Sequence, residues 1–274
     1  MTTAAITART RAVPAAAKRP GLPGTLRSEL VKIRSVRSTY WTLLVQVLAS
    51  IGWAVLDCAG IVSHGIGPDF NPAEASLTGQ VALGELIIVV LGALVITSEY
   101  STGMIRTSLA VMPRRGVLYA AKAIVFAAVT LTLSLITSFT SFFVGQAILS
   151  GKHYNTTLTQ PGVLRAVLLS AAIVTVFGLL AYGAGALVRH TAGAITSILG
   201  VIFLIPALAQ ALPNSWYADV VRWLPGGQAL SPIARSASPL SPHLFSAWGQ
   251  FAVFSGYAVV LLALGAWSFI RRDA

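Results

Sequence analysis

The sequence predicts an all-helical integral membrane protein with six transmembrane helices. An amphipathic surface helix is expected before the first span, and a short cytoplasmic helix between the second and third spans. Hydrophobic residues make up 55% of the 274-residue chain and charged residues only 10%, a composition typical of membrane proteins. The apolar residues fall into long continuous segments. The alternating pattern of a membrane β-barrel does not occur, so we expect helices alone.

Six segments are long enough to cross a bilayer as helices. Crossing the hydrocarbon core takes about 20 residues, with about 17 to 25 the common range. The six expected spans are residues 40–62, 81–97, 120–149, 164–188, 192–212 and 247–270, of which the second is the shortest. The chain therefore divides into a basic N-terminal region, residues 1–38, and a six-helix transmembrane domain, residues 39–274. We expect no cleaved signal peptide, because no short apolar core with a cleavage site precedes the first span.

The segment just before the first span has apolar residues at helical spacing with basic residues between them. The apolar residues are Leu26, Leu30 and Ile33, and the basic residues are Arg27, Lys32, Arg34 and Arg37. This pattern predicts a basic amphipathic helix on the inner membrane surface. A disordered basic linker is the alternative.

The positive charges predict the orientation of the chain. With the N-terminus in the cytoplasm, 15 Lys and Arg residues lie inside and four lie outside; leaving out the four tail residues far from the membrane, the numbers are 11 and four. Cytoplasmic loops carry the excess of positive charge in membrane proteins. Both termini are therefore expected in the cytoplasm. The net charge of +11 is explained by the anionic inner leaflet and requires no nucleic-acid partner.

Polar groups at membrane depth are the candidates for a transport path. Asp57 and Glu85 are the two acids within the spans, and Thr137 and Ser141 belong to a run of seven hydroxyl residues in the third span. Ionisable groups are costly in the membrane and often mark such paths. The alternative is that the acids reach interfacial water or a neighbouring helix and that the hydroxyls serve helix packing. Gly178, Gly183 and Gly185 are likewise expected to allow close helix packing.

Catalytic and cofactor motifs are absent from the sequence. The closest approach to a phosphate loop, Gly145 to His153, has five residues between its glycines instead of four, and His153 stands where Ser or Thr should bind magnesium. The four histidines lie in or beside separate loops without metal-ligand spacing. We therefore expect no enzyme activity, metal or cofactor in this chain.

A polar stretch between the second and third spans, residues 98–115, carries an acid, a glycine, three arginines and a proline. Ile105 and Leu109 are spaced for a short helix parallel to the membrane surface. Ser101 or Thr102 is expected near its N-terminal end, and Pro113 is expected to stop it.

The stretch from Glu99 to Arg106, followed by Leu109 and residues 113–115, resembles the inner loop after the second span of type-2 ATP-binding cassette permeases. The surface helix, the six spans and a large outer segment with a Trp-Leu-Pro element also resemble this family. The resemblance implies that the loop helix docks into a separate ATPase subunit. The residues it implies for docking are Glu99, Gly103 and Arg106, with Ile105, Leu109, Pro113 and Arg114 as weaker candidates. This chain has Met104 where family members have Thr.

The resemblance further implies a pair of six-span permeases, expected here as a homodimer, with two ATPase subunits that bind ATP and magnesium. We expect a bacterial exporter in the cytoplasmic membrane, in contact with lipid, that moves an amphipathic or lipid-like molecule such as a drug, peptide or glycolipid. An ATP-independent secondary transporter or pore that uses Asp57 and Glu85 is the second interpretation. A membrane anchor is the third.

Overall fold

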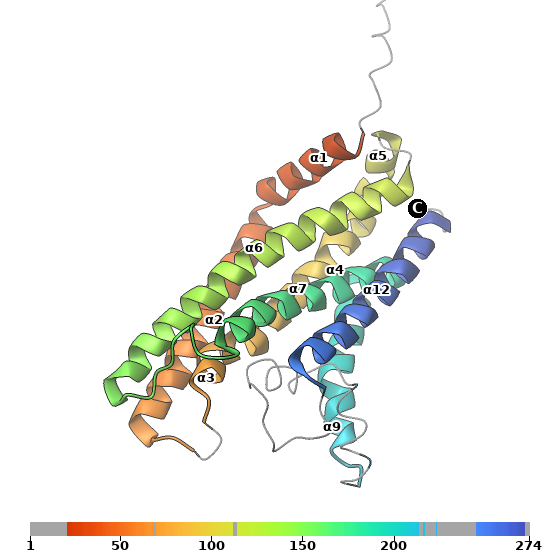
Figure 1. Ribbon diagram of the computed structural model, residues 1–274. Coiled ribbons are helices and arrows are strands. Elements are labelled where there is room, and N and C mark those ends of the chain that lie inside the picture. The colour runs from red at the N-terminus through yellow and green to blue at the C-terminus, as the bar shows by residue number, and fades with distance from the viewer. Residues whose placement is uncertain are drawn as a thin grey trace, which may run out of the picture.

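The computed structural model describes residues 21–67, 70–111, 114–213, 216, 223 and 245–271, and within these ranges its regular secondary structure is helical (Figure 1). The helices are α1 (Leu22–Ser35), α2 (Arg37–His64), α3 (Pro72–Gly79), α4 (Glu85–Ser101), α5 (Met104–Val111), α6 (Arg115–Leu149), α7 (Val163–Val188), α8 (Thr191–Leu199), α9 (Ile205–Ala209) and α12 (Ala247–Arg271). The predicted stop at Pro113 and most of the large outer segment lie outside the described residues.

Six helical segments are long and apolar enough to cross a membrane, which confirms the predicted class. They are Arg37–His64, Pro72–Ser101, Arg115–Lys152, Val163–Val188, Thr191–Ala209 and Ala247–Arg271. Each contains one of the predicted spans or most of it. The third extends to 38 residues, about 57 Å at 1.5 Å per residue, and is therefore longer than the hydrocarbon core of about 30 Å.

The second span begins nine residues earlier than predicted. The expected span starts at residue 81, but α3 starts at Pro72 and continues into α4. Asn71 caps this helix, since its Oδ1 accepts hydrogen bonds from the N–H groups of Ala73 (3.0 Å) and Glu74 (3.2 Å). Proline is well suited to the first helical turn, where its missing N–H costs nothing. Asn71 and Pro72 therefore mark a helix start ahead of the expected span.

Two of the spans contain a wide π-helical turn near their middle. Gln80–Gly84 joins α3 to α4, and Gly200–Leu204 joins α8 to α9. In contrast, α6 and α7 run without such an interruption over 35 and 26 residues. The spans thus differ in the regularity of their helices.

Helix α7 is the most buried span and packs against α4, α6, α8 and α12. Small residues allow this close approach. A Cβ atom on Gly183 would lie 2.8 Å from the backbone of Leu261 in α12, and one on Gly185 would lie 2.6 Å from the side chain of Ile96 in α4. A Cβ on Gly178 would clash with Ile88 at 2.6 Å. These contacts confirm the predicted packing role of the α7 glycines.

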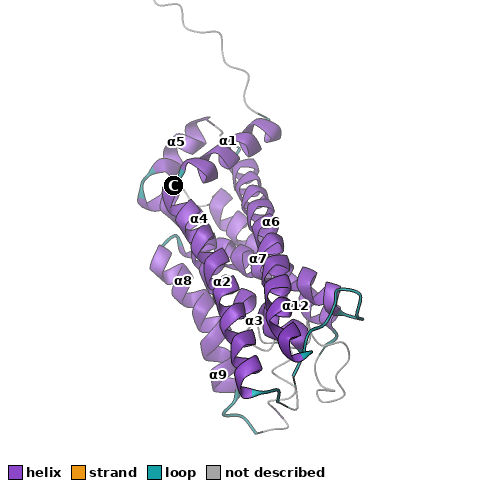
Figure 2. Cartoon of the chain, turned by 90° about the vertical axis from the view of Figure 1, so that its left-hand side faces the viewer, coloured by secondary structure: helices purple, strands orange, loops and turns teal. Residues whose placement is uncertain are grey.

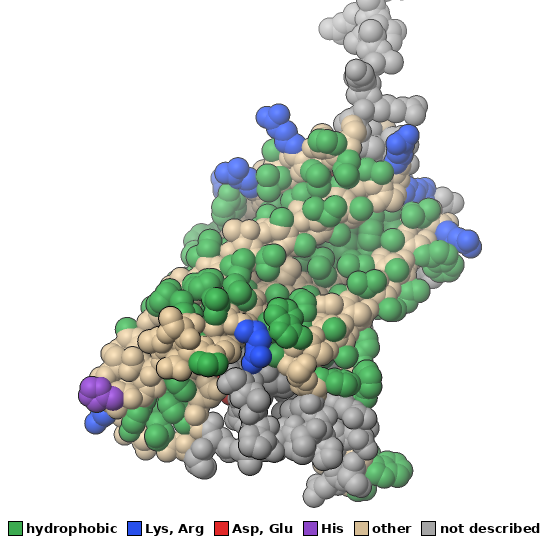
Figure 3. Space-filling view, viewed as in Figure 1, with side chains coloured by type: hydrophobic (Ala, Val, Ile, Leu, Met, Phe, Trp, Pro, Cys, Tyr) green, Lys and Arg blue, Asp and Glu red, His purple; other side chains and the backbone are tan. Residues whose placement is uncertain are grey.

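The two ends of the helical bundle differ in charge. Helices α1 and α5 and the end of α12 lie together at one end, and α3 and α9 lie toward the other (Figures 1 and 2). Ten of the 12 described Lys and Arg residues lie at the α1–α5 end, whereas Lys152 and Arg165 lie at the opposite end. Figure 3 shows a group of basic side chains at the α1–α5 end, beyond a broad apolar surface, with fewer basic side chains in the lower half of the view. The asymmetry matches the charge distribution that the sequence predicted.

Candidate functional site

Helix α5 is held against the bundle by one apolar face. Ile105 is buried in a cluster with Leu118 of α6 and Phe269 of α12, and Leu109, one turn later in α5, packs at the edge of the same cluster. Residues four apart lie on the same face of a helix. Both were predicted at helical spacing, and the structure places them toward the protein, where they fix α5 at the junction of α4, α6 and α12.

The opposite face of α5 is exposed. Met104 is 45% exposed, and Arg106, Thr107 and Ala110 are also exposed. Arg114, which follows α5, is exposed as well. The helix therefore presents a short surface with a long apolar side chain and a guanidinium group, and another protein can contact it at the basic end of the bundle.

A tight turn separates α4 from α5. Gly103 adopts φ +70°, a left-handed conformation that glycine accepts without strain, and its N–H donates to the carbonyl of Tyr100 at 3.3 Å. Ser101 and Thr102 lie just before α5, as expected, but their hydroxyls do not bond to its first turn. Both hydroxyls donate back to the carbonyl of Ser98, at 3.1 and 2.7 Å, and so belong to the end of α4.

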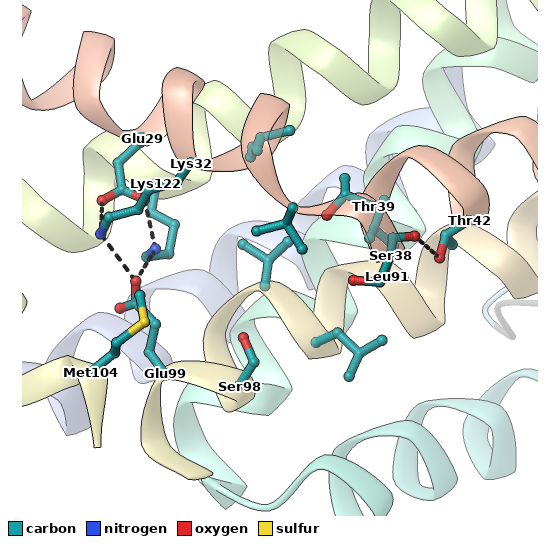
Figure 4. Close-up of a pocket in the computed structure, with 14 residues that line it drawn as sticks. Glu29, Lys32, Ser38, Thr39, Thr42, Leu91, Ser98, Glu99, Met104 and Lys122 are labelled. Carbon is teal, nitrogen blue, oxygen red and sulfur yellow. Dashed lines mark hydrogen bonds and ion pairs between the residues drawn. The ribbon is translucent and has the colours of Figure 1, made fainter. Parts of the chain in front are cut away.

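Four charged residues form a buried network beside α5, which we call the charge network: Glu29 and Lys32 of α1, Glu99 of α4 and Lys122 of α6. Lys122 donates to Glu29 at 2.6 Å and to Glu99 at 2.8 Å (Figure 4). Lys32 donates to Glu29 at 2.8 Å and to Glu99 at 3.2 Å. With two acids and two bases, the network is neutral. It joins three helices that are far apart in the sequence.

Glu99 lies inside this network and away from the molecular surface, with only 4% of the residue exposed. It is at the end of α4, one turn before α5. Lys32 extends the network to α5 itself, because its Nζ donates to the Ser108 hydroxyl at 3.3 Å. The structure thus ties the position of α5 to α1, α4 and α6 through polar contacts as well as through the apolar face of α5.

Glu29 was not predicted from the sequence, although it is 2% exposed and central to the network. A helix is present at the predicted position, but its buried residues are Thr25 and Glu29, with Lys32 half-buried on the same side. Leu30 on the other side is exposed. A single acid within a strongly basic helix was the available signal.

The two α1 members of the network are charged at neutral pH. Burial alone raises the pKa of Glu29, but the nearby Lys122 and Lys32 ammonium groups outweigh it and hold the pKa below its ordinary value of 4.5. Burial alone lowers the pKa of Lys32, but its contacts with Glu29 and Glu99 raise it above the ordinary 10.5. Each group is stabilised in its ionised form by the other members.

A cavity of about 190 Å³ lies next to the charge network, between α1, α2 and α4; we call it the interface pocket (Figure 4). The network forms its wall on one side. Leu91, Leu94 and Val95 of α4 give it an apolar wall, and Thr39 and Ser98 contribute hydroxyl groups. No local pattern in the sequence predicts this pocket, because its lining comes from segments about 60 residues apart.

The four residues predicted for a transport path, Asp57, Glu85, Thr137 and Ser141, make no described hydrogen bonds with one another. The Thr78 hydroxyl donates to Asp57 at 2.8 Å. Glu85 is buried, and its Oε1 has no hydrogen-bond partner among the described residues. Thr137 donates to the Leu133 carbonyl of its own helix, and the Ser141 hydroxyl is buried without a described partner. Because the second span starts at Pro72, Glu85 lies near its middle and not toward its outer end.

A polar cluster that the sequence analysis did not single out lies in the middle of the spans. Gln46 of α2 donates to the side-chain carbonyl of Gln80 at 3.1 Å, and Gln80 donates to the Ser134 carbonyl at 3.4 Å. Gly84 is packed against these groups, since a Cβ there would lie 2.9 Å from the Ser50 hydroxyl. Hydrogen bonds between polar side chains of neighbouring helices help to hold helices together in lipid.

Comparison with family models places much of the chain in a known family. Residues 25–208 match the family described as ABC-2 family transporter protein. The match covers about two thirds of the chain and contains α5, the charge network and the interface pocket. A search of curated proteins found no match.

Proposed function

Because the chain belongs to the ABC-2 family of transporter proteins, we propose that it is the permease subunit of an ATP-binding cassette exporter and that α5 couples it to a separate ATPase. The observation that carries this proposal is the fixed position of α5. Its buried face and the charge network hold it to three spans, while its other face is open. A force applied to α5 is therefore transmitted directly to the membrane helices.

The predicted docking residues divide into two groups in this proposal. Arg106 and Arg114 are exposed and contact the ATPase, together with Met104. Gly103 provides the turn into α5, and Ile105, Leu109 and Glu99 hold the helix in place from inside. Loss of a member of the second group weakens docking indirectly, because it releases α5. Pro113 lies outside the described residues, and its role stays a prediction.

The orientation proposed for the chain puts the α1–α5 end in the cytoplasm. The excess of described basic residues at that end supports it. Both termini are then cytoplasmic, and α5 faces the compartment that contains ATP. We propose the bacterial cytoplasmic membrane as the location, with ATP and magnesium bound by the ATPase.

The assembly proposed is a homodimer of this chain with two ATPase subunits, which moves an amphipathic or lipid-like molecule outward. The polar groups at mid-span support a path that is not purely apolar: Glu85 and Ser141 are buried with unpaired oxygen atoms among the described residues. Unpaired polar groups in lipid are costly and are retained mainly where they serve function. Asp57, bonded to Thr78, is a weaker candidate for this path.

The test is a charge reversal on the open face of α5. The tagged chain is purified in mild detergent with its ATPase, and the amount of ATPase retained and its activity are compared for the wild type, Arg106→Glu and Arg27→Glu. Arg27 is also exposed at the basic end, but on α1, so it is a matched control. We expect Arg106→Glu to lose about tenfold in retained ATPase, equal to about 1.4 kcal/mol, and Arg27→Glu to retain it.

Equal retention and activity in both variants would refute docking through this face. The competing interpretation of an ATP-independent transporter makes a different prediction. The chain alone in liposomes would then carry gradient-driven flux, and Glu85→Gln would abolish it.

A further inference from the structure

We propose that the interface pocket binds a phosphate-bearing lipid of the adjoining leaflet, which is the inner one in the proposed orientation. The lipid phosphate lies at the N-terminus of α2, and its apolar part lies along α4. This inference goes beyond ATPase docking and assigns a resident lipid to the permease. It rests on the pocket and on the membrane location.

The N-terminus of a long helix supplies the positive end of the site. Helix α2 is 28 residues long, begins at Arg37 and has no side-chain cap. The first turn of such a helix carries partial positive charge and N–H groups that bind phosphate. Ser38 and Thr39 of this turn line the pocket. The helix therefore directs its anion-binding end into the cavity.

An unpaired hydroxyl at the same place is the second, independent observation. The Thr39 residue is only 9% exposed, and its hydroxyl makes no hydrogen bond to another described residue, because its oxygen is open to the pocket that Thr39 lines. In contrast, Thr42 on the same helix donates to the Ser38 carbonyl at 2.9 Å. The polar groups of a residue this buried normally have a hydrogen-bond partner. Figure 4 shows Thr39 and Ser98 on facing sides of the space between α2 and α4, where a phosphate can accept from both hydroxyl groups.

The charged residues around the pocket do not prevent an anion from binding at the N-terminus of α2. The charge network on the other wall is neutral, because its two carboxylates are paired with Lys32 and Lys122. Lys32 is its most accessible member, with 35% of its side chain exposed. Arg34 and Arg37 are exposed and are sequence neighbours of the pocket residues Ile33, Val36 and Ser38. Glu99 Oε2 has no hydrogen-bond partner among the described residues, but the charge of this carboxylate is balanced by Lys32 and Lys122 through Oε1.

The apolar wall distinguishes a lipid from a free phosphate ion. The rest of the cavity is lined by apolar side chains. They are Leu91, Leu94 and Val95 of α4, Ile33 of α1, and Val36, which directly follows α1. These residues would be left against water if only an inorganic ion were bound. A volume of about 190 Å³ accommodates a headgroup and the start of the chains. The chains themselves continue into the bilayer.

Native mass spectrometry of the full chain in detergent tests the proposal, with dioleoylphosphatidylglycerol as the probe. Dioleoylglycerol, which lacks the phosphate, and inorganic phosphate are the comparison ligands. Thr39→Val removes the unpaired hydroxyl at constant shape, and we expect it to weaken lipid binding about tenfold. The matched control is Thr140→Val on the exposed side of α6, whose hydroxyl donates to the Ile136 carbonyl; we expect no change.

Leu94→Trp tests the apolar wall separately, and we expect it to remove lipid binding by filling the cavity. Unfolding temperatures of all variants show whether the fold is kept. Equal lipid binding by Thr39→Val and the control, or equal binding of dioleoylglycerol, would overturn the proposal. So would inorganic phosphate that binds as tightly as the lipid. No ATPase is present in this assay, so its result is independent of the docking experiment.

Discussion

Replacing Lys122 by methionine removes the most buried cation of the charge network and keeps a side chain of similar length. In the wild type its ammonium group lies 2.6 Å from Glu29 and 2.8 Å from Glu99, and its side chain is 5% exposed. Breaking a buried ion pair by removing one partner typically costs about 3–5 kcal/mol, because the other charge is left uncompensated. Lys32 still neutralises one carboxylate, so we expect a loss of about 3 kcal/mol.

The free energy of unfolding can be measured by titration with sodium dodecyl sulfate in mixed micelles. Lys152→Met, at an exposed residue just beyond the far end of α6, is the matched control and should change stability by less than about 0.5 kcal/mol. Adding Glu99→Gln to Lys122→Met restores neutrality and leaves the Glu29–Lys32 pair at 2.8 Å. We expect the double variant to regain about 2 kcal/mol.

The double-mutant cycle makes the reasoning refutable. If Lys122→Met costs no more than Lys152→Met, the network does not hold the helices together. If the double variant is as unstable as the sum of the two single variants, the loss comes from packing and not from charge.

Three further predictions concern other parts of the chain. The pKa of Glu29 is lowered on folding, so its contribution to the free energy of unfolding is present above the ordinary pKa of 4.5 and is lost as the pH falls through the folded pKa. The pKa of Lys32 is raised, so its contribution to the free energy of unfolding is present below 10.5 and is lost only as the pH rises through the folded pKa. The stability difference between wild type and Glu29→Gln should therefore shrink in acid, and a pH-independent difference would contradict this sign. Gly92→Ala pushes α4 away from the Gly178 carbonyl and should cost about 1–3 kcal/mol, whereas Gly52→Ala, with no atom within 4 Å of the new Cβ, should be neutral in the same titration. Glu85→Gln should leave the unfolding free energy unchanged or raise it, since Glu85 Oε1 has no partner to lose among the described residues; a marked fall would show that the carboxylate has a bound partner.

The spans and the short loop helix could be predicted from the sequence because each depends on a local pattern. Long apolar runs predict the spans, and Ile105 and Leu109 at helical spacing predict α5. The start of the second span was missed because Asn71 and Pro72 are typical both of turns and of helix N-termini, and composition alone does not distinguish the two.

The charge network and the interface pocket could not be predicted, because their members come from three or four separate segments. Glu29 and Glu99 are 70 residues apart, and each in isolation has the pattern of an exposed acid near a membrane surface. Their burial depends on how α1 packs against α6, where Lys122 contacts both carboxylates. The resemblance to a family indicated Glu99 as a docking residue, but its contacts with Lys32 and Lys122 are seen only in the structure.

The two π-helical turns and the uninterrupted α6 give the spans different mechanical roles. A regular helix bends little, whereas a π turn is a common place for local distortion at functional sites. Helix α6 starts beside α5, contains Lys122, and reaches Gln146 at the far side, where that residue bonds the Pro72 carbonyl at 2.9 Å. We expect α6 to act as a lever that carries a tilt at the α5 end across the bilayer. The wide turns at Gln80–Gly84 and Gly200–Leu204 are then the joints at which the neighbouring spans flex.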